Sequence, residues 1–214
     1  NSTGIPGTGQ GPGNIDLNPA VARDDAGNFV VAWDQVTQQQ NGVILDSIVV
    51  ARMFDRFGSP FDDEFQADTS AGTGGDDIQR AARNPQLVMD EQGGFLVVWE
   101  SFTGSAYDVF FRQFDNVGTP VADGQVNEPA PPADPDDPDA DLVFDEDQVN
   151  ASVAVDADGD FAVVWNGKGA RPDRLDPTDL NKVTEKDDEG VFLRKYYPDA
   201  LPVSEQSRVN RTDA

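Results

Sequence analysis

The sequence contains neither cysteine nor histidine. It therefore has no disulfide bond, no thiol nucleophile, no imidazole general base and no Ser-His-Asp arrangement, and the usual zinc sites are excluded as well. Because these absences remove most familiar enzyme chemistry, they predict a protein that is not an enzyme, with no catalytic residue. Glycoside hydrolysis needs only a pair of Asp or Glu carboxylates, so a carboxylate-based hydrolase stays open as a third hypothesis.

Positive charge is scarce as well. Lys and Arg number 15 against 40 Asp and Glu, which gives a net charge of −25. A surface this acidic repels nucleic acid and anionic lipid, and no apolar run is long enough to span a membrane. We therefore expect neither nucleic-acid binding nor membrane insertion. The acidic excess has two compatible explanations: oxygen cages for Ca²⁺, or the hydrated acidic coat of a salt-adapted protein.

One pattern occurs three times along the chain. Trp33, Trp99 and Trp165 are each 66 residues apart, and the residues before them carry Asn, Asp, Gly and Phe at identical offsets. After a loop of variable length comes a second shared half, in which an Arg recurs. The matching segments are 18–33, 84–99 and 150–165 for the first half, and 48–60, 109–120 and 191–202, with Arg52, Arg112 and Arg194, for the second.

The sequence pattern of each copy predicts four β-strands joined by tight turns. The 13 Phe favour sheets, and the 20 Gly and 15 Pro supply turns. We predict an all-β fold of three tandem four-stranded antiparallel units that resemble propeller blades, either open or closed by oligomerisation. The expected organisation is a Gly-rich segment 1–17 followed by units 18–83, 84–149 and 150–214, with an acidic Pro/Asp-rich insert at 129–147.

The two ends of the chain suggest that it is processed or a fragment of a larger protein. It begins with Asn1 rather than Met, and it ends just before a fourth Asn of the repeat would be due. We therefore expect another unit to follow, from the same chain or a neighbouring one.

The repeat pattern itself resembles a known type. The motif NPxVAxDxxGxFVVxW, followed by a strand ending in RxFDxxGxP, is similar to the tandem repeat of large secreted bacterial surface proteins, often found beside haemolysin-type calcium-binding or cadherin-like domains. The resemblance covers residues 18–210 apart from the inserted loops. It implies an extracellular or cell-surface location and a structural, adhesive or matrix role.

Calcium is the expected cofactor. Alternate carboxylates around a glycine turn can direct their oxygens at one hard cation, and the third copy has such a turn in Asp156, Asp158 and Asp160. The same turn could instead be a plain hairpin in which Asp caps its own backbone. The matching turns of the other copies are weaker metal candidates, namely Asp24, Asp25 and Asn28 in the first and Asp90, beside Glu91, in the second.

The recurring aromatic and cationic residues favour structural roles. The three Trp lie in the most apolar strands, so core packing is favoured over a sugar-stacking platform. The three Arg, flanked by aromatics, are expected to pair with acids or to cover ring faces. Sequons make Asn1, Asn150 and Asn210 potential glycosylation sites.

The first functional hypothesis is an extracellular, calcium-stabilised structural subunit. Copies of the chain would join head to tail or by strand addition into a filament, tube or surface layer. The alternative is a glycan-binding or adhesive propeller-type module of a larger surface protein.

Overall fold

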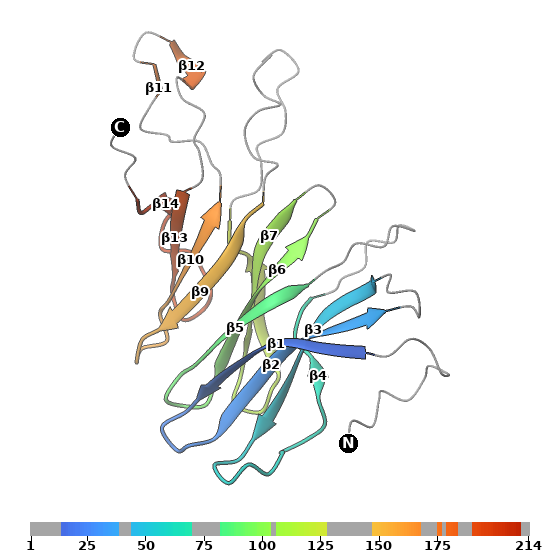
Figure 1. Ribbon diagram of the computed structural model, residues 1–214. Coiled ribbons are helices and arrows are strands. Elements are labelled where there is room, and N and C mark those ends of the chain that lie inside the picture. Colours follow the sequence, from blue (N-terminus) through green and yellow to red (C-terminus); the bar gives the residue numbers. More distant parts are fainter. Residues whose placement is uncertain are drawn as a thin grey trace.

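The computed structural model describes residues 14–38, 44–69, 82–103, 106–127, 147–167, 175–176, 179–183 and 190–210. The first 13 residues of the Gly-rich segment and residues 129–146 of the acidic insert lie outside this part of the chain. The described residues form strands and turns (Figure 1). Within them there is no helix long and apolar enough to cross a membrane.

Three antiparallel sheets of four strands follow one another along the chain, which confirms the predicted fold class. The first sheet has the order β1 (Asn14–Arg23), β2 (Phe29–Gln38), β3 (Ile44–Phe54), β4 (Phe65–Gln66). The second has the order β5 (Arg83–Met89), β6 (Phe95–Phe102), β7 (Tyr107–Phe114), β8 (Pro120–Gln125). The third has the order β9 (Val149–Val155), β10 (Phe161–Gly167), β13 (Gly190–Tyr196), β14 (Ser207–Arg208). Between β10 and β13, β11 (Leu175–Asp176) pairs with β12 (Asp179–Val183).

The turns explain why the strands end where they do. In the first turn of the third sheet, Asp156 N–H donates to the Asp160 carbonyl at 2.9 Å, and Gly159 adopts φ +87°. Only glycine enters this left-handed region without a steric cost from Cβ. The last turn of the third copy lacks the glycine, and there Ala200 adopts φ +62° in its place.

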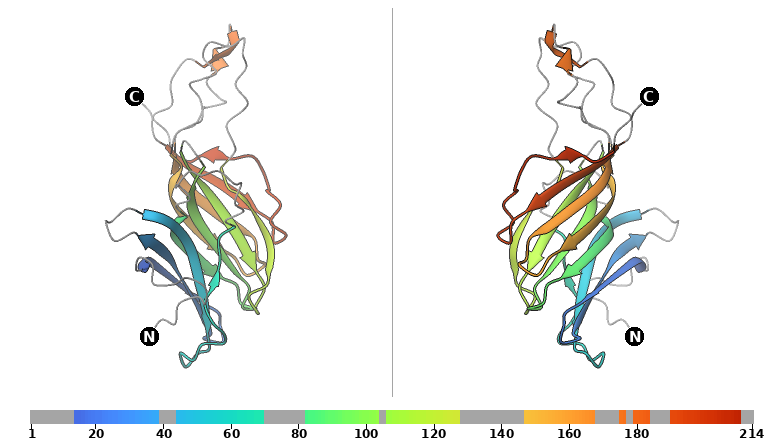
Figure 2. Two further views of the ribbon diagram at one scale, coloured as in Figure 1. Left: turned by 90° about the vertical axis from the view of Figure 1, so that its right-hand side faces the viewer. Right: turned by 90° about the vertical axis from the view of Figure 1, so that its left-hand side faces the viewer.

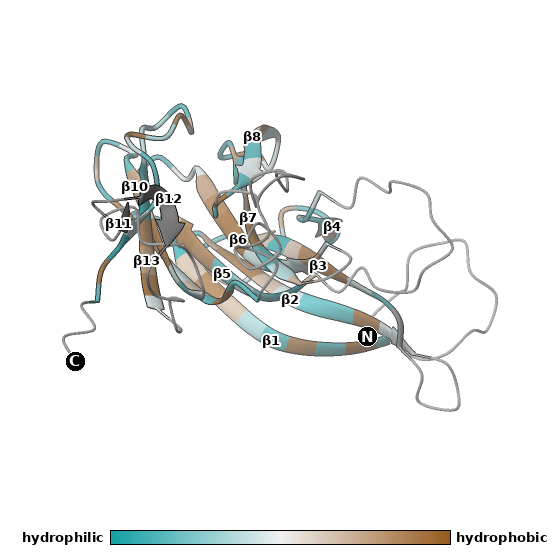
Figure 3. Ribbon diagram, turned by 90° about the horizontal axis from the view of Figure 1, so that it is seen from above, coloured by the Kyte–Doolittle hydropathy of each residue, from teal (hydrophilic) through white to brown (hydrophobic). Residues whose placement is uncertain are grey.

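The three sheets are arranged like the blades of a fan (Figure 2). Their first strands lie side by side, with β5 in contact with both β1 and β9. One apolar core joins the first sheet to the second, and another joins the second to the third. Because both faces of the second sheet are covered, β6 is apolar almost throughout, as its colour in Figure 3 shows.

We name the two faces of each sheet by these contacts. The leading face packs on the preceding sheet, and in the second sheet it includes Phe95, Val97 and Trp99. The trailing face packs on the following sheet, and in the second sheet it includes Leu96 and Val98. Side chains alternate between the two faces along each strand.

Candidate functional site

Irregularities in the first strands place one asparagine of each copy at a common point. The register of β1 against β2 shifts between Leu17 and Ala20, and that of β5 against β6 shifts between Arg83 and Gln86. Such bulges re-aim side chains and are common beside functional sites. The three asparagines all adopt positive φ, at +49° for Asn18, +53° for Asn84 and +56° for Asn150. We call the place where β1, β5 and β9 meet the hub.

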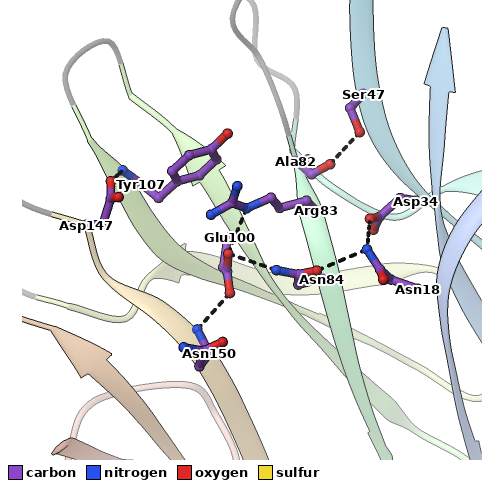
Figure 4. Close-up of polar contacts among 10 residues, drawn as sticks. All are labelled: Asn18, Asp34, Ser47, Ala82, Arg83, Asn84, Glu100, Tyr107, Asp147 and Asn150. Carbon is purple, nitrogen blue, oxygen red and sulfur yellow. Dashed lines mark hydrogen bonds and ion pairs between the residues drawn. The ribbon is translucent and has the colours of Figure 1, made fainter. Parts of the chain in front are cut away.

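A hydrogen-bonded ladder links the three sheets at the hub (Figure 4). The Asn18 amide donates to Asp34 Oδ2 at 2.7 Å and to Asn84 Oδ1 at 3.0 Å. The Asn84 amide donates to Glu100 Oε2 at 3.1 Å, and the Asn150 backbone N–H donates to Glu100 Oε1 at 2.7 Å. Asp34 and Glu100 each follow the repeat tryptophan, and each accepts from the asparagine of its own copy, while Glu100 also accepts from the asparagine of the next copy.

Asp34 is a buried carboxyl group with an incomplete set of partners. It is 2% exposed, and its Oδ1 has no hydrogen-bond partner in the described part of the chain. Burial raises its pKa above the usual value; the Asn18 side chain and the Asn84 backbone oppose the shift, the charge of Glu100 adds to it, and that of Arg83 opposes it. The raised pKa favours the protonated form of Asp34 relative to an exposed aspartate.

Glu100 has acceptor contacts on both oxygens. It is fully buried, and Arg83 Nε donates to its Oε2 at 2.8 Å. The Arg83 guanidinium also lies 3.4 Å from the ring centroid of Tyr107, whose backbone N–H donates to Asp147 Oδ1 at 3.0 Å. Stacking on the ring fixes the guanidinium in position. Arg83 is therefore held both by the Tyr107 ring and by the Glu100 carboxylate with which it pairs.

A hollow of about 450 Å³ opens at the hub. The three hub asparagines line it, together with the residues that follow them, Gln86 and Glu100. Asp34 does not line it, but bonds to Asn18, which does. The hollow therefore presents several amide groups, with prolines supplying apolar surface between them and the buried, hydrogen-bonded Glu100 carboxylate in its wall.

The carboxylates predicted to bind calcium lie in the turns between first and second strands, away from the hub. Asp156 Oδ1 accepts the backbone N–H groups of Asp158 and Asp160, both at 3.0 Å. Asp24 bonds through both oxygens to Asn28, and Asp90 accepts from the backbone of Gln92 and Gly94. Asp25 lies exposed in the first of these turns.

No group of three or more acidic side chains in the described residues is arranged to hold a metal. Calcium binding at these turns stays a prediction.

The recurring Trp and Arg residues are placed as expected in most copies. Trp99 and Trp165 are 2% and 1% exposed, whereas Trp33 is half-buried. The guanidinium groups of Arg52, Arg112 and Arg194 lie over the rings of Phe54, Phe114 and Tyr196 at 5.8, 5.6 and 5.8 Å.

The three sequons are placed differently. Asn150 lies at the hub, Asn210 Oδ1 accepts the Val191 N–H at 2.8 Å, and Asn1 is outside the described residues. Their glycosylation stays a prediction.

Sequence reasoning missed the hub. The hub asparagines were visible as part of the repeat, but nothing marked them as binding residues. The position after each Trp was overlooked because its residue type differs between copies, being Asp34, Glu100 and Asn166. A polar residue recurring directly after a strongly apolar strand segment was the signal that could have found it.

No family model and no curated protein matches the chain. Similar solved structures include a Dyadobacter fermentans protein of unknown function (12% identity, TM-score 0.53, 91% of this chain and 54% of that one). They also include a Hadza microbial sialidase (12%, 0.52, 91% and 37%) and a candidate glycoside hydrolase from Parabacteroides distasonis (12%, 0.50, 95% and 52%). At this identity the likeness shows the fold, a β-propeller-like arrangement of blades. The chain spans between 37% and 54% of the length of these three solved chains.

These neighbours correct two predictions. Two of the three are named for glycan-cleaving enzymes, the third has no stated function, and none of them is named as a filament or surface-layer protein. The prediction of a structural subunit that forms a filament, tube or surface layer is therefore wrong, and so is the prediction that the chain is not an enzyme. The latter rested on the missing Cys and His, yet Asp and Glu alone suffice for glycoside chemistry.

Proposed function

We propose that the chain is the glycan-recognising part of a carbohydrate-active β-propeller, and that the hub hollow is its binding site. The observation that carries the proposal is the convergence of three repeat-equivalent asparagines, Gln86 and Glu100 on one hollow of about 450 Å³. That volume suits a small ligand such as one or two sugar rings.

The chemistry of the lining fits sugar hydroxyl groups. An amide both donates and accepts, a carboxylate accepts, and a hydroxyl can pair with either. The positive φ values of the hub asparagines hold these groups in a backbone conformation that is rare outside glycine. Asn enters this region more readily than other residues with a side chain, so the backbone sets the direction of these amide groups at little cost.

Charge at the hub favours a neutral glycan over an anionic one. The hollow contains the Glu100 carboxylate, Asp34 lies directly behind Asn18, and the chain carries a net charge of −25. The Arg83 cation at the hub is already paired with Glu100. An acidic sugar would therefore meet net repulsion.

The test is binding to an array of neutral and sialylated oligosaccharides, followed by calorimetry on the strongest neutral ligand. Gln86 lines the hollow but makes no bond to another sheet, since its amide donates to the adjacent Pro85 carbonyl. We expect Gln86→Ala to weaken binding about tenfold through the loss of polar contacts. The matched control is Gln92→Ala in an exposed turn, which should bind like the wild type. Absence of glycan binding would contradict the proposal.

A second candidate function, glycoside hydrolysis, is favoured by the two unlike carboxyl groups of the hub. Glu100 lines the hollow, and Asp34 has a raised pKa, as a general acid requires. Asp34 lies behind Asn18 rather than on the hollow, so it would reach a substrate only after Asn18 moves aside. Release of reducing sugar from the bound neutral glycan would be measured. Turnover should fall at least about 100-fold in Glu100→Gln, and also in Asp34→Asn, with circular dichroism verifying the fold. Binding without turnover would leave the recognition proposal intact and contradict this second one.

Calcium binding, an extracellular location and the kinship with secreted surface proteins stay predictions alongside this proposal. None of them is needed for glycan recognition at the hub.

A further inference from the structure

The two contacts between sheets in this chain are built from the same parts. On the leading face of the second sheet, Phe95 and Phe114 stack at 4.7 Å, and Phe65 of the first sheet meets Phe114 at 5.6 Å. On the leading face of the third sheet, Phe161 and Tyr196 stack at 4.6 Å, and Phe111 of the second sheet meets Phe161 at 5.4 Å. Each stacked pair is thus completed by a ring from the sheet before it.

An arginine also reaches back to the preceding sheet in each contact, and an asparagine does so in the second contact. Arg112 Nη1 donates to the Asp68 carbonyl at 3.3 Å, and Arg194 Nη1 donates to the Val126 carbonyl at 2.9 Å. At the hub, the Asn150 N–H donates to Glu100 of the second sheet. The same features of the following sheet are used in both contacts, although the ring they meet on the preceding sheet comes from β4 in the first contact and from β7 in the second.

The first sheet presents the same leading face with nothing on it in the described part of the chain. Its pair, Phe29 and Phe54, stacks at 5.0 Å in the same way, but both rings are only half-buried, and the neighbouring Val21 is 66% exposed. Arg52 donates to the Asp62 carbonyl of its own sheet rather than to another sheet.

The third sheet presents the complementary trailing face. Ala162, Val164, Val191 and Leu193 stand where the second sheet has Leu96, Val98, Val109 and Phe111, which are 0–4% exposed in the second core. The third-sheet residues are only partly buried, and Val209, which matches the fully buried Val126, is 56% exposed.

We propose that a second copy of this chain covers both faces, with the leading face of each copy's first sheet packed on the trailing face of the other copy's third sheet. Two such contacts related by a twofold axis use every open face, so the assembly closes at six blades and does not grow further. This proposal is independent of glycan binding.

The internal contacts specify the partners across the new one. Leu193 of one copy would meet the Phe29–Phe54 pair of the other, as Phe111 meets Phe161. Arg52 would turn to the carbonyl of Val209, which stands where Val126 does. Asn166, exposed and placed like Glu100, would accept the backbone N–H of Asn18.

One more polar contact can be placed across the proposed interface, and the net charge of the two copies opposes their association. Lys195, exposed on the trailing face of the third sheet, stands where Gln113 does, and Gln113 reaches the next sheet's last turn at the Pro198 carbonyl. Lys195 would therefore approach the carbonyl of Arg56, which stands where Pro198 does in the turn that begins at Asp55 of the second copy, and the Arg56 charge offsets the attraction of Asp55. The net charge of −25 on each copy opposes association, so the dimer should tighten as salt screens the repulsion.

The experiment is sedimentation velocity of the full chain over a range of concentrations, at low salt and at about 0.5 M NaCl. We expect a closed species of twice the 23.1 kDa chain mass, favoured at high salt. Val31→Asp on the open leading face and Val164→Asp on the open trailing face should each weaken the dimer about 100-fold or more, because both contacts then bury an unpaired charge. The matched control Val121→Asp, at a position 59% exposed on β8, should dimerise normally.

Mixing the two variants separates an interface effect from misfolding. A mixed dimer concentrates both changes in one contact and leaves the other contact wild type, so dimer should partly return on mixing, while circular dichroism of each variant alone stays native. A chain that is monomeric at every concentration and salt overturns the proposal, and so do a mass that grows without limit and variants that do not rescue each other.

Discussion

Trp33 on the first sheet and its copies, Trp99 and Trp165, occupy the same place in the repeat but different surroundings. The later two are 2% and 1% exposed and lie within the cores between sheets, whereas Trp33 is half-buried and donates its indole N–H to Asp16 at 3.2 Å. The repeat therefore encodes a contact between sheets as well as the fold of one sheet. What differs is whether another sheet of the described part of the chain packs on that face.

The largest effect should come from removing the tryptophan at a filled contact. Trp99→Ala leaves a large cavity and should lower the free energy of unfolding by about 3–5 kcal/mol. Trp33→Ala removes a side chain that already meets water, and should cost the isolated chain only about 1–2 kcal/mol. Urea unfolding at low protein concentration measures both. Trp165→Ala is the control and should match Trp99→Ala. Equal losses of unfolding free energy at all three positions would contradict the view that Trp33 lacks the packing of the other two.

The outer edge of the sheets offers a second comparison, between Asp68 and its equivalents Asn127 and Asn210. Each accepts a backbone N–H from the third strand of its sheet, from Val49 at 3.2 Å in the case of Asp68. Asn does this without charge, but burial raises the pKa of Asp68 to about 6, with the Gln66 amide and the Val49 N–H opposing the shift.

The sign of the pH effect follows from that pKa. Because the folded-state value lies above the ordinary value of 3.8, the folded protein binds this proton more tightly than the unfolded chain does. Stability from Asp68 is fully present below about pH 4 and is lost as the pH rises through about 6. At about pH 7, Asp68→Asn should therefore raise the free energy of unfolding by up to about 3 kcal/mol, with little change at about pH 4.

Thermal and urea unfolding across this pH range check the Asp68 prediction. Asp123→Asn, at an exposed position of β8, is the control and should follow the wild-type pH profile. A profile for Asp68→Asn that parallels the wild type would show that another group carries the pH dependence.

Much of the fold could be predicted from the sequence because each copy carries the same apolar strand segments and glycine turns. The even spacing of Trp33, Trp99 and Trp165 marked three units, and the glycine turns marked the strand ends. The contradicted predictions concerned function, for which the sequence offered only the absence of Cys and His. Chemistry that needs only carboxylates leaves no such mark in a chain with 40 acidic residues.

The hub could not be predicted because it forms from parts that are unremarkable alone. Asn18, Asn84 and Asn150 come together only when three sheets align their first strands, and the positive φ of an Asn is not legible in its sequence context. Glu100 looks like a surface charge after a strand, yet it is fully buried because the next sheet covers it. Contacts between repeats, rather than within them, create the site.

The smallest expected effect is stabilisation by calcium. It should distinguish the first turn of the third sheet, where we expect the ion to bind, from that of the first sheet. Asp24 bonds to Asn28 through both oxygens, at 2.8 Å each, so a cation there would have to share or displace these bonds. Asp156 uses only Oδ1 on the backbone, while Asp158 and Asp160 contribute to the turn through their backbone groups. Their carboxylates and Asp156 Oδ2 are the oxygens that Ca²⁺ could reach. Calcium at about 5 mM should stabilise the chain by about 1 kcal/mol if it binds there with millimolar affinity.

Substitutions in the two turns distinguish two causes of stabilisation by calcium, a specific binding site and general screening of acidic charge. Asp158→Asn together with Asp160→Asn keeps the backbone bonds of the turn and should abolish the calcium-dependent shift in Tm, whereas Asp25→Asn in the first turn should leave it unchanged. Chelator should reverse the shift in the wild type at fixed ionic strength. If all variants respond to calcium alike, the carboxylates act only through the −25 charge of the whole chain, and the turn of the third sheet is a hairpin like the other two.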